Sequence, residues 1–220
     1  MTTALERTFV LTAFRISILM AVASLVGCTV YSADPITATV VDADTGAPIE
    51  GVNVVAAWEL AGGINDGAVV GYANLMETIT DKNGYFHFSN WGPRLTPYGK
   101  VRLNAPVILL FKSGYRFVEF ANNGRAGANA SPKLKSDWDG KSVSMKRFVG
   151  TATQYEESFL NLRVAISNLE KNHKLAEIPE FMCSLLTQRA ILAAEGVRDA
   201  LHSQDWLRSR GVVCAQMEKA

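Results

Sequence analysis

The sequence predicts a mostly β protein with an α appendage, in which a seven-stranded β-sandwich precedes a C-terminal helical segment. Three observations support this fold class. Between residues 35 and 149, short runs of β-branched and aromatic residues alternate with turn-forming residues. After Gly150 the spacing of apolar residues changes to that of α-helices. The third observation is an uninterrupted apolar run over residues 16–26, which lies before Cys28 and outside both of these regions.

The β region divides into strands at its turn signals. Asp44, Gly46 and Pro48 follow the first alternating run, and Asn83-Gly84 separates two later runs. Asn-Gly favours the positive φ angles of tight hairpin turns, so a hairpin is expected there. The strands are expected at residues 36–42, 52–60, 77–80, 85–88, 107–112, 115–120 and 141–148. Short strands separated by turns in this way are typical of a β-sandwich.

Residues 39–52, with Asp42, Thr45 and Gly46, and residues 80–88 together resemble the carboxypeptidase regulatory-like domain. The later step through Ser113, Gly114 and Tyr115 matches the strand-Gly-Tyr pattern of that family. The resemblance implies a transthyretin-like (prealbumin-like) sandwich over residues 35–149. It also implies a domain without catalytic residues, which in metallocarboxypeptidases accompanies a separate zinc peptidase domain.

The C-terminal region, residues 150–220, is expected to be helical. The apolar residues from Tyr155 to Leu169 recur every three or four positions, which predicts an amphipathic helix over residues 153–171. Pro179 fits the first turn of a second helix ending near Ala194, and a third is expected over residues 197–208. Because short helices are marginal alone, we expect this region to pack on the sandwich.

The N-terminal 27 residues have the features of an export signal. Arg7 and Arg15 precede an apolar run over residues 16–26, which is shorter than the roughly 20 residues of a membrane-spanning helix. Residues 25–28, Leu-Val-Gly-Cys, resemble the lipobox of bacterial lipoproteins, which implies acylation at Cys28 and a tether over residues 28–34. The alternative is an ordinary signal peptide with an unrelated cysteine.

The remaining cysteines, Cys183 and Cys214, form an even pair in a protein expected to enter an oxidising compartment. We therefore predict a disulfide between them. In the chain-entropy model, a disulfide that closes a loop of about 31 residues stabilises the fold by roughly 3.7 kcal/mol. The alternative is two unpaired thiols.

Charge and motifs exclude several function classes. The 22 basic and 21 acidic residues leave no basic field for nucleic acid. The three histidines lack metal-protease spacing, and no serine-hydrolase elbow or phosphate loop occurs, so we expect no enzyme activity, metal or cofactor. A calcium loop starting at Asp81 is excluded because its twelfth position is Gly92.

We therefore expect a non-catalytic protein that is held in the cell envelope by its N-terminal lipid and docks to another envelope protein. Thr29, rather than aspartate, after Cys28 resembles signals that direct lipoproteins to the outer membrane, facing the periplasm or the cell surface. The alternative is a lipoprotein that binds glycan or a small molecule. Its candidate ligand-contact residues are those on long loops, Trp91, Arg94, Tyr98 and Trp138.

Overall fold

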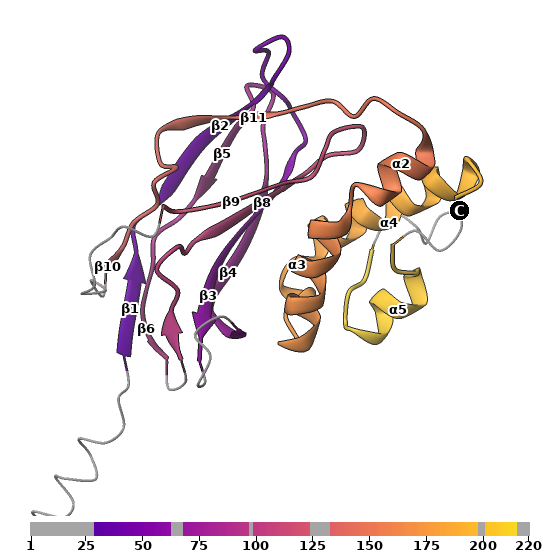
Figure 1. Ribbon diagram of the computed structural model, residues 1–220. Helices are drawn as coiled ribbons and strands as arrows, with labels where there is room; N and C mark the ends of the chain where they lie inside the picture. The colour runs from indigo at the N-terminus through magenta and orange to yellow at the C-terminus, as the bar shows by residue number, and fades with distance from the viewer. Residues whose placement is uncertain (1–28, 63–67, 97–98, 124–132, 198–200, 215–220) are drawn as a thin grey trace, which may run out of the picture.

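The computed structural model describes residues 29–62, 68–96, 99–123, 133–197 and 201–214. The molecule is mostly β, with several sheets in a sandwich-like arrangement and a helical part at its C-terminal side (Figure 1). The fold class predicted from the sequence is confirmed.

Three sheets build the β part. The first has the order β10 (Lys133–Leu134), β1 (Thr29–Ala33) and β6 (Trp91–Thr96). The second has the order β11 (Lys141–Met145), β2 (Ile36–Asp42) and β5 (Tyr85–Phe88). The third has the order β4 (Val69–Ile79), β3 (Asn53–Ala61), β8 (Val107–Phe111) and β9 (Val118–Ala121), with β7 (Lys100–Val101) also paired to β3.

The third sheet is the middle layer of the molecule, because its central strands are buried on both faces. In β3, Val54 and Trp58 enter the core between the sheets, whereas Val55 faces the helices. In β8, Ile108 and Leu109 divide in the same way. Burial on both faces explains why these two strands read as almost continuous apolar runs.

The helices form the outer layer against this sheet (Figure 1). They are α2 (Ala152–Glu157), α3 (Leu160–Lys171), the 3₁₀ helix η1 (Leu175–Glu177), α4 (Pro179–Ala194) and α5 (Gln204–Ser209). Phe111 of β8 is fully buried and packs edge-on against Phe159 and Phe181, with ring centroids 6.1 Å apart in both cases. The expectation that the helical region packs on the sandwich is confirmed.

A carboxylate of the sheet caps one of these helices. Glu77 of β4 accepts hydrogen bonds from the backbone N–H groups of Glu180 (3.1 Å) and Phe181 (3.0 Å) in the first turn of α4. These N–H groups have no partner within the helix, so the contact satisfies them from the neighbouring layer. Pro179 occupies the first position of α4, as predicted.

Cys183 and Cys214 are joined by a disulfide, with their Cα atoms 5.6 Å apart, and the predicted pairing is confirmed. The bond links α4 to the segment after α5. The C-terminal end of the described chain is thereby held against the helix that packs on the sheet.

The described residues form eleven strands where seven were expected, because β1, β6, β7 and β10 lie in segments expected to be tether or loop. The strand expected at residues 77–80 begins at Val69, and it forms no hairpin with β5, because β4 pairs with β3 and β5 with β2. Three of the differences have a local cause. Thr29–Ala33, expected within the tether, form β1, because Tyr31 and Ala33 alternate into the core. The single helix expected over residues 153–171 is interrupted after α2, where the Ser158 hydroxyl donates to the Tyr155 carbonyl (2.6 Å) and competes with the helical pattern. The third helix starts late, at Gln204, because Ser203 caps it by accepting from the Trp206 N–H.

Candidate functional site

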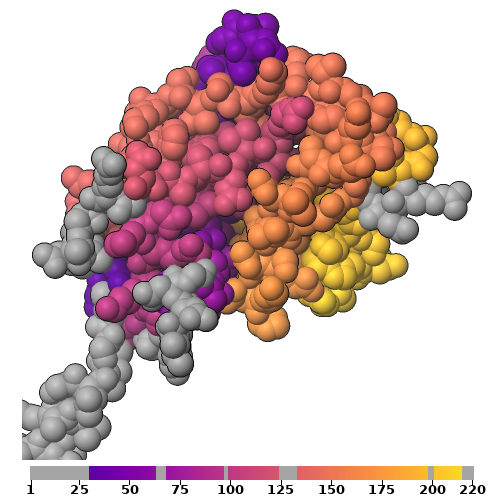
Figure 2. Space-filling view, in the orientation of Figure 1, coloured from indigo at the N-terminus to yellow at the C-terminus, as the bar shows by residue number. Residues whose placement is uncertain are grey.

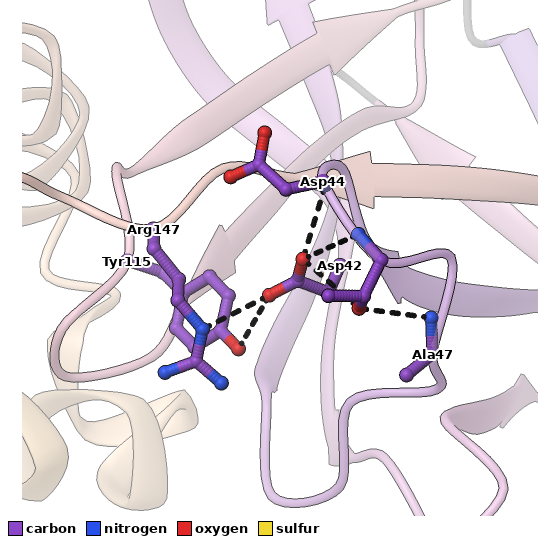
Figure 3. A network of polar contacts seen from close by, with 6 residues as sticks. Asp42, Asp44, Ala47, Tyr115 and Arg147 are labelled. Atoms are coloured by element: carbon purple, nitrogen blue, oxygen red, sulfur yellow. Dashed lines mark hydrogen bonds and ion pairs between the residues drawn. The ribbon is translucent and has the colours of Figure 1, made fainter.

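Asp42, Thr45 and Tyr115, three of the residues that carry the family resemblance, meet in a polar network (Figure 3). Asp42 ends β2 and is only 4% exposed. Its Oδ1 accepts from the backbone N–H groups of Asp44 (3.0 Å) and Thr45 (3.1 Å). Its Oδ2 accepts from the Tyr115 hydroxyl (3.0 Å) and from Nε of Arg147 (3.1 Å). One carboxylate therefore joins three separate segments.

Burial alone would raise the pKa of Asp42, but the hydrogen bonds from Thr45, Asp44 and Tyr115 outweigh it and hold this pKa below its ordinary value. Asp44 directs its carboxylate away from the network (Figure 3). A fully bonded, ionised Asp42 has a structural role: it fixes the turn after β2 to the segments around Tyr115 and Arg147.

The sequence-predicted contact residue Trp91 lies in the core and offers no ring to a ligand. It is 7% exposed and packs edge-on against Trp58, with ring centroids 5.3 Å apart. Arg94 lies over the Trp91 ring at 5.9 Å and donates to Oδ1 of Asn74 (2.6 Å). The Trp91 ring, expected to be exposed on a loop, is therefore buried in β6, where the sandwich uses its apolar area for packing.

Trp138 is partly buried and packs against the same apolar core that contains Trp91. Its ring packs on Phe120, with centroids 4.4 Å apart, and its Nε1 donates to the carbonyl of Ala121 (3.1 Å). The single N–H donor of this indole is thus already bonded within the protein. Tyr98 and the predicted lipidation residue Cys28 lie outside the described residues.

Sequence reasoning missed a hollow between the middle sheet and α3. Its polar lining is Glu59 of β3, Tyr72 of β4, Glu119 of β9 and Asn168 of α3, and its cavity volume is about 40 Å³. Val164 of α3, which is 55% exposed, also lines this hollow. In the space-filling view the boundary between the strands and the orange helix α3 crosses the visible face (Figure 2).

The acidic groups of this hollow have perturbed protonation. Burial raises the pKa of Glu59, Arg102 opposes this rise across an ion pair of 3.4 Å, and Glu119 adds to it. Burial also raises the pKa of Glu119, again opposed by Arg102. Burial, with the charge of Glu59, raises the pKa of Tyr72 above its ordinary value. Perturbed acids gathered in a cleft are typical of binding sites.

One signal in the sequence pointed to this hollow. Glu59 is a carboxylate inside the otherwise apolar run of β3, where an unpartnered charge is unfavourable. The pairing of β3 with β4 places Tyr72 opposite Glu59, and the packing of α3 on the sheet adds Asn168.

A second hollow, of about 200 Å³, lies between the tip of the β8–β9 hairpin and α2 and α4. Tyr155 spans it: its hydroxyl donates to the carbonyl of Tyr115 (2.8 Å) and accepts from the N–H of Gly114 (2.9 Å). Ser113 donates to Oε1 of Gln188 at 2.6 Å. These bonds are internal, so the polar groups join the hairpin to the helices.

In the described part of the chain, no three His, Cys, Asp or Glu side chains are grouped so that they could hold a metal ion. None of the helices described is both long and apolar enough to cross a membrane.

Comparison with known proteins identifies no family. No protein-family model and no curated protein sequence matches the chain. Among solved structures it is similar to 3-chlorocatechol 1,2-dioxygenase from Rhodococcus opacus 1CP, at 14% identity and a TM-score of 0.32, over 56% of this chain and 62% of that one. It is also similar to the shaft pilin SpaA from Lactobacillus rhamnosus GG, at 14% identity and a TM-score of 0.24, over 56% and 47% of the two chains. The matched part therefore spans less than two thirds of either protein.

Proposed function

We propose that this protein is a cell-envelope lipoprotein, acylated at Cys28, whose folded body is a non-catalytic binding or structural module that docks to another envelope protein. One observation carries the proposal. The lipobox-like residues 25–28 end immediately before Thr29, the first residue of β1. Cleavage before Cys28 would make the acylated cysteine the N-terminal residue of an intact sandwich.

The disulfide supports the same compartment. Cys183 and Cys214 are paired, and disulfides persist in oxidising compartments such as the bacterial periplasm. With those two cysteines joined, Cys28 is the one cysteine left in the sequence for acylation. Thr29 after it favours the outer membrane, with the body facing the periplasm or the cell surface.

The hollow beside α3 is the surface that we assign to the partner. We call it the docking surface, and it consists of Glu59, Tyr72, Glu119, Val164 and Asn168 together with Leu160. Leu160 and Val164 are 65% and 55% exposed and lie one helical turn apart, so they form a single apolar strip. Beside this strip, the carboxylates of Glu59 and Glu119 share the cation Arg102. A protein segment that carries an apolar side chain next to a lysine or arginine complements both features.

The glycan or small-molecule alternative has lost its main support, because Trp91 is in the core and the Trp138 ring packs on Phe120. A protein partner is therefore the proposal that the remaining surface favours.

The test is in-cell cross-linking of the full-length protein, followed by mass spectrometry of attached proteins and of the N-terminal peptide. We expect an acylated Cys28 peptide and one recurrent partner, which Cys28→Ser removes from the cross-linked fraction. Val164→Glu places a charge in the apolar strip and should also reduce the cross-link. Asn161→Glu adds the same charge on α3 outside the hollow and serves as the matched control.

Two results would contradict the proposal. An N-terminal peptide without acyl groups would remove the anchor. Cross-links only to abundant envelope proteins, together with retention on wall glycan, would replace a protein partner with a carbohydrate.

A further inference from the structure

The first strand carries an exposed apolar pair at the end nearest Cys28. Val30 is directly opposite Leu95 in the antiparallel pairing of β1 with β6, and the two side chains are 45% and 58% exposed. Opposite residues on one sheet face have Cβ atoms about 4.5–5.5 Å apart. The pair therefore forms one continuous apolar surface.

Among the described residues, neither a neighbouring strand nor the core covers this pair. Tyr31 and Ala33 point inward, at 1% and 4% exposure, which leaves Val30 on the opposite face of β1. β10 pairs only with Ser32 and Ala33, so it covers the far half of β1 and not Val30. Isolated exposed apolar pairs are common on protein surfaces. This pair differs because Val30 is only two residues from Cys28.

Other exposed groups lie at the same end of the sandwich. Thr29 pairs with Thr96, and Lys100 follows four residues later, which is a span of at most about 14 Å. Val70, 46% exposed, lies beside Gly99, since a Cβ there would be 3.2 Å from Cγ2 of Val70. Figure 1 shows the start of β1 at one end of the molecule, and the last residue of β6 is paired with it.

We infer that this end of the sandwich lies directly on the lipid surface that holds Cys28, with Val30 and Leu95 at the level of the lipid headgroups and Lys100 beside them. We call it the membrane-facing end, and it consists of Val30, Val70, Leu95 and Lys100. The inference rests on the proposed acylation of Cys28. It adds to that proposal a lipid contact by the folded body and a fixed orientation.

The argument is the length of chain between lipid and body. No residue separates Cys28 from β1, and a strand advances about 3.4 Å per residue, so Val30 lies within about 7 Å of the acylated residue. Acyl chains enter the membrane at the headgroup boundary. The end of β1 must then reach that boundary, where removal of Val30 and Leu95 from water is favourable. An exposed lysine there favours anionic headgroups.

The experiment uses the purified, full-length acylated protein in vesicles of phosphatidylethanolamine and phosphatidylglycerol. The photo-cross-linker p-benzoylphenylalanine replaces Leu95 in one sample and Lys82, an exposed residue of the β4–β5 turn, in the matched control. We expect severalfold more lipid adduct by intact mass at position 95 than at position 82. Both positions are exposed, so both variants should fold.

Lipid adducts that are equally rare at the two positions, in protein that is acylated and pelleted with the vesicles, would overturn the inference and leave the proposed anchor intact. Protein without acyl groups would overturn both. In cells, an adduct between position 95 and another protein in place of lipid would likewise overturn it, because this end would then be a protein interface.

Discussion

At the scale of single residues, the molecule contains carboxylates that are perturbed in opposite directions. Asp42 is buried yet satisfied by hydrogen bonds from backbone, hydroxyl and guanidinium groups, and these lower its pKa. Glu59 is buried with less compensation, and its pKa is raised. Ionised Asp42 therefore favours folding, whereas ionised Glu59 opposes it.

Asp42→Asn should destabilise the protein at neutral pH, because an amide cannot accept all the bonds that the carboxylate accepts. Since the folded-state pKa lies below 3.8, the contribution of Asp42 is complete above that value and is lost as pH falls through the folded pKa. The difference between wild type and variant should therefore narrow in acid. Denaturant unfolding at pH 7 and in acid measures this, and Asp44→Asn, whose carboxylate points away, should unfold like the wild type.

Glu59→Gln should change the pH dependence of stability in the opposite sense. Above pH 4.5, Glu59 keeps its proton in the folded protein but loses it in the unfolded chain. The free energy of unfolding therefore falls as pH rises from 4.5 through the raised pKa of Glu59. The glutamine variant should show a shallower fall over that window in denaturant titrations. Glu157→Gln, which removes an exposed carboxylate of α2, is the control. An unchanged slope in Glu59→Gln would mean that Arg102 fully compensates the burial.

At the scale of elements, the outer helical layer is joined to the sheet by packing and to itself by a covalent bond. Phe111 contacts both Phe159 and Phe181, Glu77 caps α4, and the disulfide closes a loop of 31 residues. Apolar contact thus fixes where the helices lie, whereas the disulfide restricts their unfolded states.

Replacement of both Cys183 and Cys214 by serine should lower the free energy of unfolding by about 3–4 kcal/mol, as expected for a loop of this length. The measurement is denaturant unfolding with and without reductant. Reductant should bring the wild type to the level of the double variant and leave the variant unchanged. Two free thiols in the exported wild type would contradict the disulfide itself.

The sequence predicts most of the elements because their signals are local. The turn after Asp42, the turn at Asn83-Gly84 and Pro179 at the start of α4 were all readable from short segments. The hairpin expected at Asn83-Gly84 was wrong, because β4 pairs with β3 and β5 pairs with β2, so this turn joins two sheets. The break after α2 could not be read from the sequence, because the apolar spacing continues across Ser158. The hollow at Glu59 could not be read from the sequence, because its lining comes together only when β3 pairs with β4 and α3 packs on the sheet.

At the scale of the whole molecule, the proposed anchor and the layers define an orientation. The membrane-facing end includes the start of β1, and the Asp42 turn ends the strand that follows it. The docking surface lies along the side, between the middle sheet and α3 (Figures 1 and 2). A partner would therefore approach parallel to the membrane.

The position of β1 between β6 and β10 also has a mechanical consequence. A pull on acyl chains at Cys28 would act along the axis of β1, while its hydrogen bonds to β6 and β10 run across that axis. Such a load shears these bonds together and does not open them one after another. An anchor built in this way transmits tension from the membrane into the sandwich without first unravelling its N-terminal strand.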